Sequence, residues 1–531
     1  MRKSYDAIII GGGHNGLTAA AYLAKAGRRV LVLERRHLVG GAAVTEEIFP
    51  GFKYTVYSYV VSLLPPRIIQ ELQLPKHGLH VLPLEGAFTP MEDGNYIASY
   101  ADEDDTLDEI RRHSIRDADI FPVFSNMMYD LARAVRPILT MSPPDLANPG
   151  MEGLRTLRDL GSHLKSLGKE KFHWLTKIMT MSAYDFLSEW FETDVLIATL
   201  AQIGIIGTFL GPKSPGTAYV LLHYYLGELD GASSAWGFQR GGTGGVSEAL
   251  ASAARSFGAE IRCNAPVQEV IIKHGQAIGV ALDNGDELYA EIIISACDPR
   301  VTFRTLVDEN ELPTELVEAI DNFKFRGSSG KVNLALDGLP DFPAMKDKAL
   351  MRAMQEICPS VEYLERAFDD AKYGAFSRRP FMGCIIPSTV DPSMAPPGKH
   401  VMSIFVQYAA YDMPEYGDRD EQREAFGDAV VDTLAEFAPN IKDFILHKQV
   451  ITPWDIEQTT GITEGNISHG ELMLDQLFFM RPTPGWARYR TPIRNYYQCG
   501  SGTHPGGGIT GTTGRKAAEA VMKDGHYKWR Q

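Results

Sequence analysis

The stretch IIIGGGHNG, Ile8 to Gly16, joins a short apolar run to a cluster of glycines near the start of a 531-residue chain. The full apolar run, Tyr5 to Ile10, has the length of a buried strand, and the glycines after it end that strand. The next segment, LTAAAYLAKAG, places its apolar residues at helical spacing and ends at Gly27. A second apolar run, Val30 to Leu33, completes the pattern. The sequence therefore predicts a strand–helix–strand unit of the Rossmann type.

Each glycine in the first turn is needed for a different physical reason. Gly11 permits a tight turn, Gly13 lets a pyrophosphate approach the backbone, and Gly16 lets the helix pack closely on the strand. The helix start supplies unpaired N–H donors and the positive end of a dipole, which favour an anion. Glu34, directly after the second strand, can accept hydrogen bonds from ribose hydroxyls and would repel a 2′-phosphate. We expect a dinucleotide other than NADP, the alternative being a glycine turn with a structural role alone.

A second pair of glycines follows in LERRHLVGGAAVT, where Gly40 and Gly41 come shortly after the acid. The run from Ile8 to Thr45 resembles the extended FAD fingerprint of the amine oxidase and phytoene desaturase superfamily. The resemblance implies FAD as the cofactor and an α/β fold, with a Rossmann-type FAD-binding domain (glutathione reductase-2 / amine oxidase-like) and a discontinuous mixed α+β substrate domain. It also assigns cofactor contacts to further residues of this run, namely His14, Asn15, Arg35 and Ala42.

A third glycine-rich stretch, CGSGTHPGGGITGTTG from Cys499 to Gly514, lies near the other end of the chain. A strand-like segment precedes it, and RKAAEAVM after it has the pattern of a helix. Backbone N–H groups at such a helix start can stabilise negative charge on a reduced flavin. We therefore expect the two ends of the chain to hold opposite ends of one FAD. The resemblance assigns cofactor contacts here to Gly500, His504, Pro505, Gly506, Gly507, Gly508 and Ile509.

The segment Gly237 to Pro299 is similar to family segments that return the chain to the FAD domain. Its GGTGG opens a helix, and short alternating strands follow with a turn at Asn284-Gly285. We interpret GGTGG as a helix-opening turn without a second nucleotide, because SSAWGFQR before it lacks the pattern of a buried strand. The resemblance places the backbone of Val267 at the adenine edge. The predicted domains are 1–60, 236–300 and 486–531 for FAD binding, and 61–235 and 301–485 for the substrate.

Composition and charge narrow the class of partner. The chain is 44% hydrophobic and has a formal net charge of −15, which is typical of a globular protein and disfavours nucleic acid as a partner. Five cysteines stand far apart, without the spacing of a zinc site or a dithiol pair, so we expect no metal and a reducing compartment. The first strand begins at Tyr5 and leaves no room for a targeting peptide, so a cytoplasmic location is expected. A homo-oligomer is left open.

One apolar run, VLIATLAQIGIIGTFLG from Val195 to Gly211, raises the question of a membrane. It is too short to span a bilayer, and it contains Gln202. A core helix is the first interpretation. The alternatives are a wall of an apolar substrate cavity and a shallow contact with a bilayer, which would make the protein a peripheral membrane protein.

The resemblance implies an FAD-dependent oxidoreductase of the desaturase or dehydrogenase type, which takes hydride from a saturated carbon of a largely apolar small-molecule substrate. Dioxygen or a quinone is the expected electron acceptor, because the sequence contains no evident nicotinamide site. Two alternatives come from other classes. One is an amine oxidase-type enzyme, with an apolar cage around an uncharged amine, and the other is a non-catalytic FAD-binding scaffold or assembly factor.

Three residues outside the glycine loops are candidates for catalysis. GSSGKVNLALDGLPDF predicts a strand that begins at Lys331, where a lysine is usually solvated. The stretch nevertheless resembles the strand from which amine oxidase-type flavoenzymes send a lysine ammonium toward flavin N5 to assist electron transfer to oxygen. His469 and Arg481, in the family-like stretch GNISHGELMLDQLFFMRP, are the other two. A satisfied buried histidine and an arginine paired with an acid are the alternatives for them.

Overall fold

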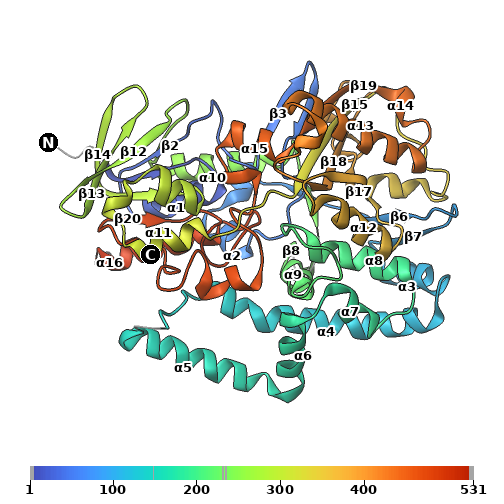
Figure 1. The fold of residues 1–531 in the computed structure, drawn as a ribbon, viewed down its shortest axis with the longest axis horizontal. Helices are drawn as coiled ribbons and strands as arrows, with labels where there is room; N and C mark the ends of the chain where they lie inside the picture. Colours follow the sequence, from blue (N-terminus) through green and yellow to red (C-terminus); the bar gives the residue numbers. More distant parts are fainter. Residues whose placement is uncertain (1–4, 147–148, 230–231, 234–235, 526–531) are drawn as a thin grey trace.

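The computed structural model describes residues 5–146, 149–229, 232–233 and 236–525. Two sheets organise the chain, and Figure 1 shows them at opposite ends of the long axis with several helices along the lower side. The expectation that no targeting peptide precedes the first strand concerns residues 1–4, which lie outside the described residues.

The first sheet contains the predicted Rossmann unit. Its strand order is β11-β2-β1-β14-β13-β12, and β20 also pairs with β14. The bounds of its strands are β1 (Tyr5–Ile10), β2 (Val30–Leu33), β11 (Glu260–Arg262), β12 (Val267–Lys273), β13 (Gln276–Leu282), β14 (Glu287–Ser295) and β20 (Tyr496–Gln498). The strands β2 and β14 pair parallel with β1, and β12, β13 and the first part of β14 form antiparallel hairpins. Segments from the start, middle and end of the chain thus share one sheet.

Strand β1 is buried on both faces, as a central strand of a parallel sheet must be. Ala7 and Ile9 pack into the core formed with the helices of one face, which are α1 (His14–Lys25), α10 (Gly244–Ser256) and α16 (Thr512–Asp524). Ile8 and Ile10 alternate with them and pack on the opposite face, against Phe303. The predicted strand, helix and strand around the first glycine loop are confirmed.

The second sheet has the order β19-β15-β18-β17-β16-β6-β7. Its strands are β6 (Gly86–Pro90), β7 (Tyr96–Tyr100), β15 (Ser329–Leu336), β16 (Met354–Ile357), β17 (Phe376–Ile385), β18 (His400–Ala409) and β19 (Ile445–Ile451). Val332, Leu334 and Leu336 of β15 pack in one core with Phe426 of helix α13 (Arg419–Phe437), whereas Ala335 belongs to another core. The predicted strand and its two alternating faces are confirmed.

Other helices surround the second sheet or join the two sheets. Their bounds are α2 (Pro66–Glu71), α3 (Glu103–Arg111), α4 (Ile115–Thr140), α5 (Gly150–Ser166), α6 (Gly168–Thr180), α7 (Ala183–Ser188), α8 (Asp194–Ala201), α9 (Thr217–Tyr224), α11 (Thr314–Asp321), α12 (Val361–Ala371), α14 (Ile441–Phe444) and α15 (Pro453–Thr460). Short antiparallel pairs join β3 (Thr45–Phe49) to β4 (Phe52–Thr55), β5 (Val81–Pro83) to β10 (Gly237–Gln239), and β8 (Glu228–Leu229) to β9 (Ala232–Ser233).

The apolar run from Val195 to Gly211 lies largely inside the protein. It forms α8 and the 3-10 helix Gln202–Ile205, and Leu196 and Ile197 are at most 5% exposed. The run packs in a core of the protein, which agrees with the first interpretation as a core helix, and the alternative of a shallow membrane contact stays a prediction. Across the described ranges, no helix combines the length and the apolar character that a membrane span requires.

The segment before the GGTGG turn also differs from expectation. The described part of SSAWGFQR contains the short strand β10, and its residues Gly237, Phe238 and Gln239 are buried. This strand pairs with β5 and stands outside the first sheet, so α10 does not begin a second Rossmann unit there. The alternation of only three residues is too short for a sequence pattern to reveal.

Helices α1 and α16 touch through their first turns because glycine occupies the contact. A Cβ on Gly514 would come within 2.0 Å of the Asn15 carbonyl oxygen. Gly514→Ala should therefore push the two helices apart and lower the free energy of unfolding by about 1–3 kcal/mol. Thermal unfolding followed by circular dichroism measures the change.

Gly161→Ala is the matched control for this prediction, because Gly161 is also helical but a Cβ there meets no described atom within 4 Å. Alanine at that exposed helical position should be neutral or stabilising by up to about 1 kcal/mol. Equal melting temperatures for Gly514→Ala and the wild type would show that the α1–α16 contact can relax without cost.

Candidate functional site

The first glycine loop lies between β1 and α1 and is open on one side. Gly11 has φ +99°, in the region that favours glycine. A Cβ on Gly16 would lie 2.2 Å from the Gly11 carbonyl oxygen, so this position is closed by helix–strand packing. A Cβ on Gly13, in contrast, would have none of the described heavy atoms within 4 Å. Gly13 therefore leaves room for an anion at the N-terminus of α1, as predicted from the sequence.

Glu34 lies beside this loop, at the end of β2 where the cofactor's ribose is expected. Its side chain is buried, and Oε2 accepts from the Gly12 N–H at 2.8 Å while Oε1 accepts from the Arg36 N–H at 2.9 Å. These two bonds fix the carboxylate at the end of β2 and leave lone pairs for further donors. The Ala265 N–H donates to the Glu34 carbonyl at 2.9 Å, which brings Val267, two residues further on, close to the same end of the sheet.

The second glycine pair folds over the first loop. The Gly40 N–H donates to the Gly12 carbonyl at 2.9 Å. The nearest atom to a Cβ on Gly41 would be the Gly13 Cα, at 3.4 Å. Ala42 follows directly and is half-buried. The glycines that the sequence singled out around the two turns therefore lie together in space.

Of the two arginines after Glu34, the structure favours the one that the sequence did not single out. Arg35 is exposed and reaches toward Gly461. Arg36 pairs with Glu46 at 2.9 Å, and its Nη1 is buried without a partner in the described part of the chain. Two successive arginines are equivalent in a sequence pattern, and only the direction of the backbone after β2 distinguishes them.

The C-terminal loop begins at Gly500, which packs tightly against the end of β14. A Cβ on Gly500 would lie 2.2 Å from the Cys297 carbonyl oxygen. Ser501, the next residue, accepts from Asn15 Nδ2 at 3.1 Å, so this loop contacts the start of α1 directly. The two ends of the chain meet here, as expected.

The same loop continues through His504, Pro505, Gly506, Gly507, Gly508 and Ile509. Gly506 and Gly508 have φ values of +122° and +99°, which explains the need for glycine at both positions. Gly507 packs against Ser468, since a Cβ there would come within 2.6 Å of the serine side chain. The Tyr489 hydroxyl donates to the His504 carbonyl at 3.0 Å and so holds the backbone of His504 in place.

The residues around both loops fit FAD. The His14 imidazole lies close to the backbone of Gly508, so the first loop approaches the third. Several buried polar atoms beside the loops have no partner among the described residues, namely His14 Nε2, Asn15 Oδ1, Arg36 Nη1, His469 Nδ1 and His504 Nδ1. Burying so many unpaired polar atoms is costly unless a ligand supplies their partners. A cofactor rich in phosphate, ribose and ring heteroatoms supplies them.

Arg481 is buried completely and pairs with no acid among the residues that the structure describes. Its guanidinium donates to five backbone carbonyl oxygens, those of Ser468, Gly470, Glu471, Gln476 and Ser501, at 2.7–3.1 Å. Burial lowers the pKa of Arg481 to about 9. The alternative of an arginine paired with an acid therefore finds no support among the described residues. The geometry makes Arg481 a positioning residue that holds the chain around the C-terminal loop, and a direct catalytic role stays a prediction.

Four buried histidines surround this arginine. His469 has φ +56° and a buried, unpaired Nδ1 in the described structure, and Arg481 opposes positive charge on it. The imidazole of His223 of α9 lies close to the backbone of Gly507. Burial lowers the pKa to about 4 for each of the four imidazoles, those of His14, His223, His469 and His504. All four are therefore neutral near pH 7 and can each donate one hydrogen bond and accept another.

Lys331 is buried and not solvated. It is 1% exposed, and its Nζ has no hydrogen-bond partner among the residues described. The Nζ lies 4.8 Å from the centre of the Tyr59 ring, which in turn stacks on Phe405. Burial holds the pKa of Lys331 well below its usual range, and the expected role of its ammonium beside flavin N5 stays a prediction.

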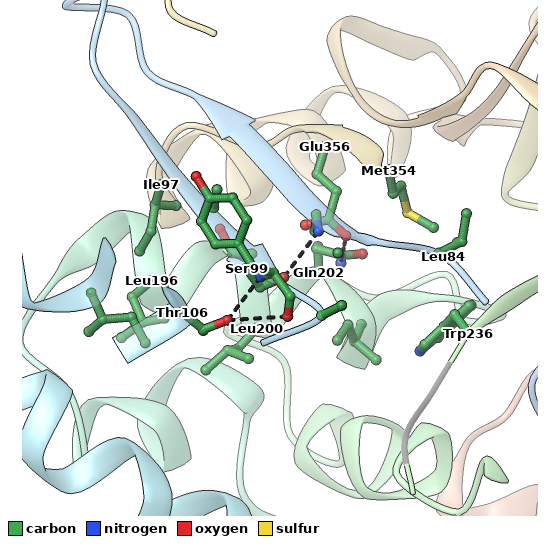
Figure 2. A pocket seen from close by; sticks show the side chains of 18 of the residues that line it. Leu84, Ile97, Ser99, Thr106, Leu196, Leu200, Gln202, Trp236, Met354 and Glu356 are labelled. Atoms are coloured by element: carbon green, nitrogen blue, oxygen red, sulfur yellow. Dashed lines mark hydrogen bonds between the residues drawn. The ribbon is translucent and has the colours of Figure 1, made fainter. Parts of the chain in front are cut away.

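A cavity of about 290 Å³ lies between the second sheet and helices α3, α4 and α8. Figure 2 shows Gln202 and Glu356 meeting in its wall, close to apolar side chains that include Leu84, Ile97, Leu196, Leu200, Trp236 and Met354. Tyr59 also lines this cavity and connects it to Lys331. Residues of the run from Val195 to Gly211 form part of the wall, so the run does line a cavity, and the use of that cavity for substrate stays a prediction.

Four residues of this region were not predicted as site residues from the sequence: Tyr59, Gln202, His223 and Glu356. None belongs to a spaced motif, and Gln202 and Glu356 are 154 positions apart in the chain. A polar residue inside an apolar run was the one available signal, and Gln202 shows it. The others become visible only when the tertiary structure brings them to a common site.

The comparisons with known proteins agree with this site. The family model "Flavin containing amine oxidoreductase" matches residues 89–522, and a model for an NAD(P)-binding Rossmann-like domain matches residues 9–69. The expected FAD cofactor and the resemblance to the amine oxidase superfamily are therefore confirmed. These models do not identify the substrate.

Two full-length relatives are informative. The chain is 39% identical over 548 residues to the rat (Rattus norvegicus) pyridine nucleotide-disulfide oxidoreductase domain-containing protein 2, covering 99% of this chain and 94% of the relative. It is 29% identical over 550 residues to a limonene dehydrogenase subunit of Castellaniella defragrans, covering 98% and 95%. Both alignments extend through the glycine loops and the second sheet.

Among solved structures, cyclohexylamine oxidase from Brevibacterium oxydans matches with a TM-score of 0.58 at 18% identity, over 98% of this chain and 99% of that one. At this identity the match supports the shared fold of the two sheets. It is independent of the local motifs from which the fold was first inferred.

The position of Glu34 generates a prediction for cofactor binding. Glu34→Ala removes a buried carboxylate that faces the ribose side of the first loop, so FAD affinity should fall by ~2 to 4 kcal/mol. Glu34→Gln keeps an acceptor without the charge and should lose less. Fluorescence titration of the apoprotein with FAD measures both dissociation constants.

Glu269→Ala on the exposed side of β12 provides the control, since it removes a carboxylate from the same sheet away from the loops. Its FAD affinity should equal that of the wild type. An unchanged dissociation constant for Glu34→Ala would contradict the assignment of Glu34 to the ribose.

Proposed function

Because this chain belongs to the flavin containing amine oxidoreductase family and binds FAD, we propose that it is a dehydrogenase acting on a saturated carbon of a small, largely apolar substrate. The observation that carries the proposal is the apolar cavity lined by Tyr59, on whose ring the buried amine of Lys331 rests. A cavity of about 290 Å³ is at the lower end of the usual range of ligand pockets, roughly 300–1,000 Å³. Its size favours a compact molecule over a long polyene.

The relative named as part of a limonene dehydrogenase supports this class of substrate. Limonene is a compact cyclic hydrocarbon, and removal of hydride from such a molecule requires a redox cofactor and the exclusion of water more than it requires charged side chains. The cavity wall here is mostly apolar, as that chemistry demands. The likeness to an amine oxidase supports the fold and adds no argument for an amine substrate.

When bound, FAD would supply the hydride-accepting chemistry, and the protein supplies binding, orientation and a dry environment. The glycine loops and Glu34 hold the cofactor. The neutral histidines near Arg481 can donate hydrogen bonds to the bound cofactor or accept them from it, and they add no charge. Lys331 Nζ has no hydrogen-bond partner among the described residues, so it is free to interact with negative charge that develops beside it.

Dithiol chemistry plays no part in the proposal, although the name of the rat relative refers to a disulfide oxidoreductase domain. All five cysteines are unpaired in the structure. Burial raises the pKa of Cys297, the thiol beside Gly11, to about 12, so this thiol is protonated at neutral pH. The thiolate is the reactive form in disulfide exchange.

The first test is reduction of the bound flavin without oxygen. Limonene, as a compact cyclic hydrocarbon, should bleach the visible absorbance of the oxidised flavin, and cyclohexylamine should not. Leu200→Trp, which fills the cavity from α8, should slow this reduction at least about tenfold while dithionite still reduces the flavin fully. Reduction by the amine alone would identify an amine oxidase, and reduction by no organic compound would support a structural flavin.

Lys331 generates a prediction for the second half of the cycle. Lys331→Met keeps the length of the side chain but cannot take a proton, so FAD should remain bound while reoxidation by dioxygen slows by roughly 10-fold to 100-fold. Stopped-flow mixing of the dithionite-reduced protein with oxygen measures this rate.

Lys448→Met is the matched control, because Lys448 lies on the neighbouring strand β19 and pairs with Asp428 of α13 on the far side of the sheet. Its reoxidation rate should match the wild type. If Lys331→Met is also reoxidised at the wild-type rate, Lys331 has no role in oxygen reduction, and a quinone becomes the preferred acceptor.

A further inference from the structure

Glu356 is a buried carboxyl group in the wall of the cavity and is not part of the FAD site. It belongs to β16, and its side chain is on average 5% exposed. Its Oε1 accepts a hydrogen bond from Gln202 Nε2 at 2.9 Å. Its Oε2 is buried and has no hydrogen-bond partner within the described ranges. Figure 2 shows the Gln202–Glu356 pair where helix and sheet come together at the cavity.

The hydroxyl groups of the serine and the two threonines in the cavity wall already have hydrogen-bond partners in the protein. Ser99 Oγ accepts from the Ala87 N–H at 3.0 Å. Thr106 Oγ1 donates to the Asp102 carbonyl at 3.0 Å, and Thr199 Oγ1 donates to the Val195 carbonyl at 2.8 Å. These groups are therefore engaged with the protein. Glu356 differs from them because one of its two oxygens still needs a partner.

The surroundings of Glu356 favour its neutral form. No ion pair connects it to a lysine or arginine in the described part of the chain, and Lys331 lies against Tyr59 instead. The titratable groups that face it are Tyr59 and Cys358, and burial raises the pKa of each of them, so neither supplies charge. Burial likewise raises the pKa of Glu356 to about 8, against a weak opposing effect of the Thr89 hydroxyl. At neutral pH the group is a carboxylic acid.

A neutral carboxylic acid in this position is a hydrogen-bond donor. Its carbonyl-type oxygen accepts from Gln202, and its O–H is then free to donate toward a ligand. A hydrocarbon in the cavity would leave this donor unpaired, which costs free energy. A ligand with one acceptor oxygen would satisfy it. A protonated amine would require the ionised form, which burial opposes.

We propose that Glu356, oriented by Gln202, is the recognition group of the cavity and donates a hydrogen bond to a single acceptor oxygen, a carbonyl or hydroxyl oxygen, on an otherwise apolar compact substrate. The inference rests on the proposed function in one respect, namely that this cavity holds the substrate. It narrows the substrate class from an apolar molecule to an apolar molecule with one oxygen function.

The test measures binding directly, so that it does not depend on turnover. Isothermal titration of the FAD-loaded protein compares carvone, a cyclic ketone, with limonene, the hydrocarbon of the same skeleton, and with cyclohexylamine. At pH 7 the ketone should bind at least about tenfold tighter than the hydrocarbon. Its affinity should fall as the pH rises through about 8, because the acid loses the proton that it donates.

Two variants separate the donor from the shape of the side chain. Glu356→Gln retains an N–H donor together with an acceptor for Gln202, so it should keep the ketone preference and lose the pH dependence. Glu356→Leu has a similar volume without a donor and should bind the ketone and the hydrocarbon about equally. Flavin absorbance and melting temperature, measured for each variant, establish that the protein is folded and loaded.

Several outcomes would overturn the inference. Equal affinity for ketone and hydrocarbon in the wild type would do so, as would a ketone preference that persists in Glu356→Leu. Binding of none of the three compounds would also contradict it. So would tight amine binding that strengthens as the pH rises and disappears in Glu356→Gln. The proposed function fails differently. If the ketone preference depends on Glu356 but no compound reduces the flavin, the recognition site stands and the dehydrogenase does not.

Discussion

The arrangement of the functional region depends on the hydrogen bonds that the buried guanidinium of Arg481 donates. A buried cation is expensive, and this chain offsets that cost with five backbone carbonyl oxygens drawn from Ser468 to Gln476 and from Ser501. Because all these oxygens must converge on one planar group, the irregular chain before the C-terminal loop has little freedom. The positions of His469 and Gly507 follow from it, and so does the shape of the surface that the FAD-binding loop presents.

The parts of this structure that follow local rules could be predicted from the sequence. The strands and helix around Gly11 to Gly16 depend on period and glycine placement, and β15 depends on alternation over several residues. The environment of Lys331 could not be predicted, because the pattern of a strand does not reveal whether its polar face meets water or another part of the fold. The same limit applies to Glu356. Only the packing of α8 against β16 converts an ordinary acid into a buried one.

The cofactor loops and the cavity use different chemical groups, and the difference has a physical reason. The loops use glycine and backbone N–H groups, which can approach phosphate and ring atoms closely and resemble those of other family members. The cavity uses side chains on a sheet and on short helices, where one substitution changes shape or polarity without disturbing the cofactor. Tyr59 lines the cavity, and its ring also contacts Lys331.

The contact between Asn15 and Ser501 joins residues that are 486 positions apart in the chain. During synthesis the first glycine loop therefore leaves the ribosome long before its partner exists. The complete set of cofactor contacts can form only when nearly the whole polypeptide has emerged, and closing so large a loop makes this a late event in folding. Until then the Rossmann unit carries an uncovered apolar face where α16 will pack, and the nascent protein must be kept from aggregation over that interval.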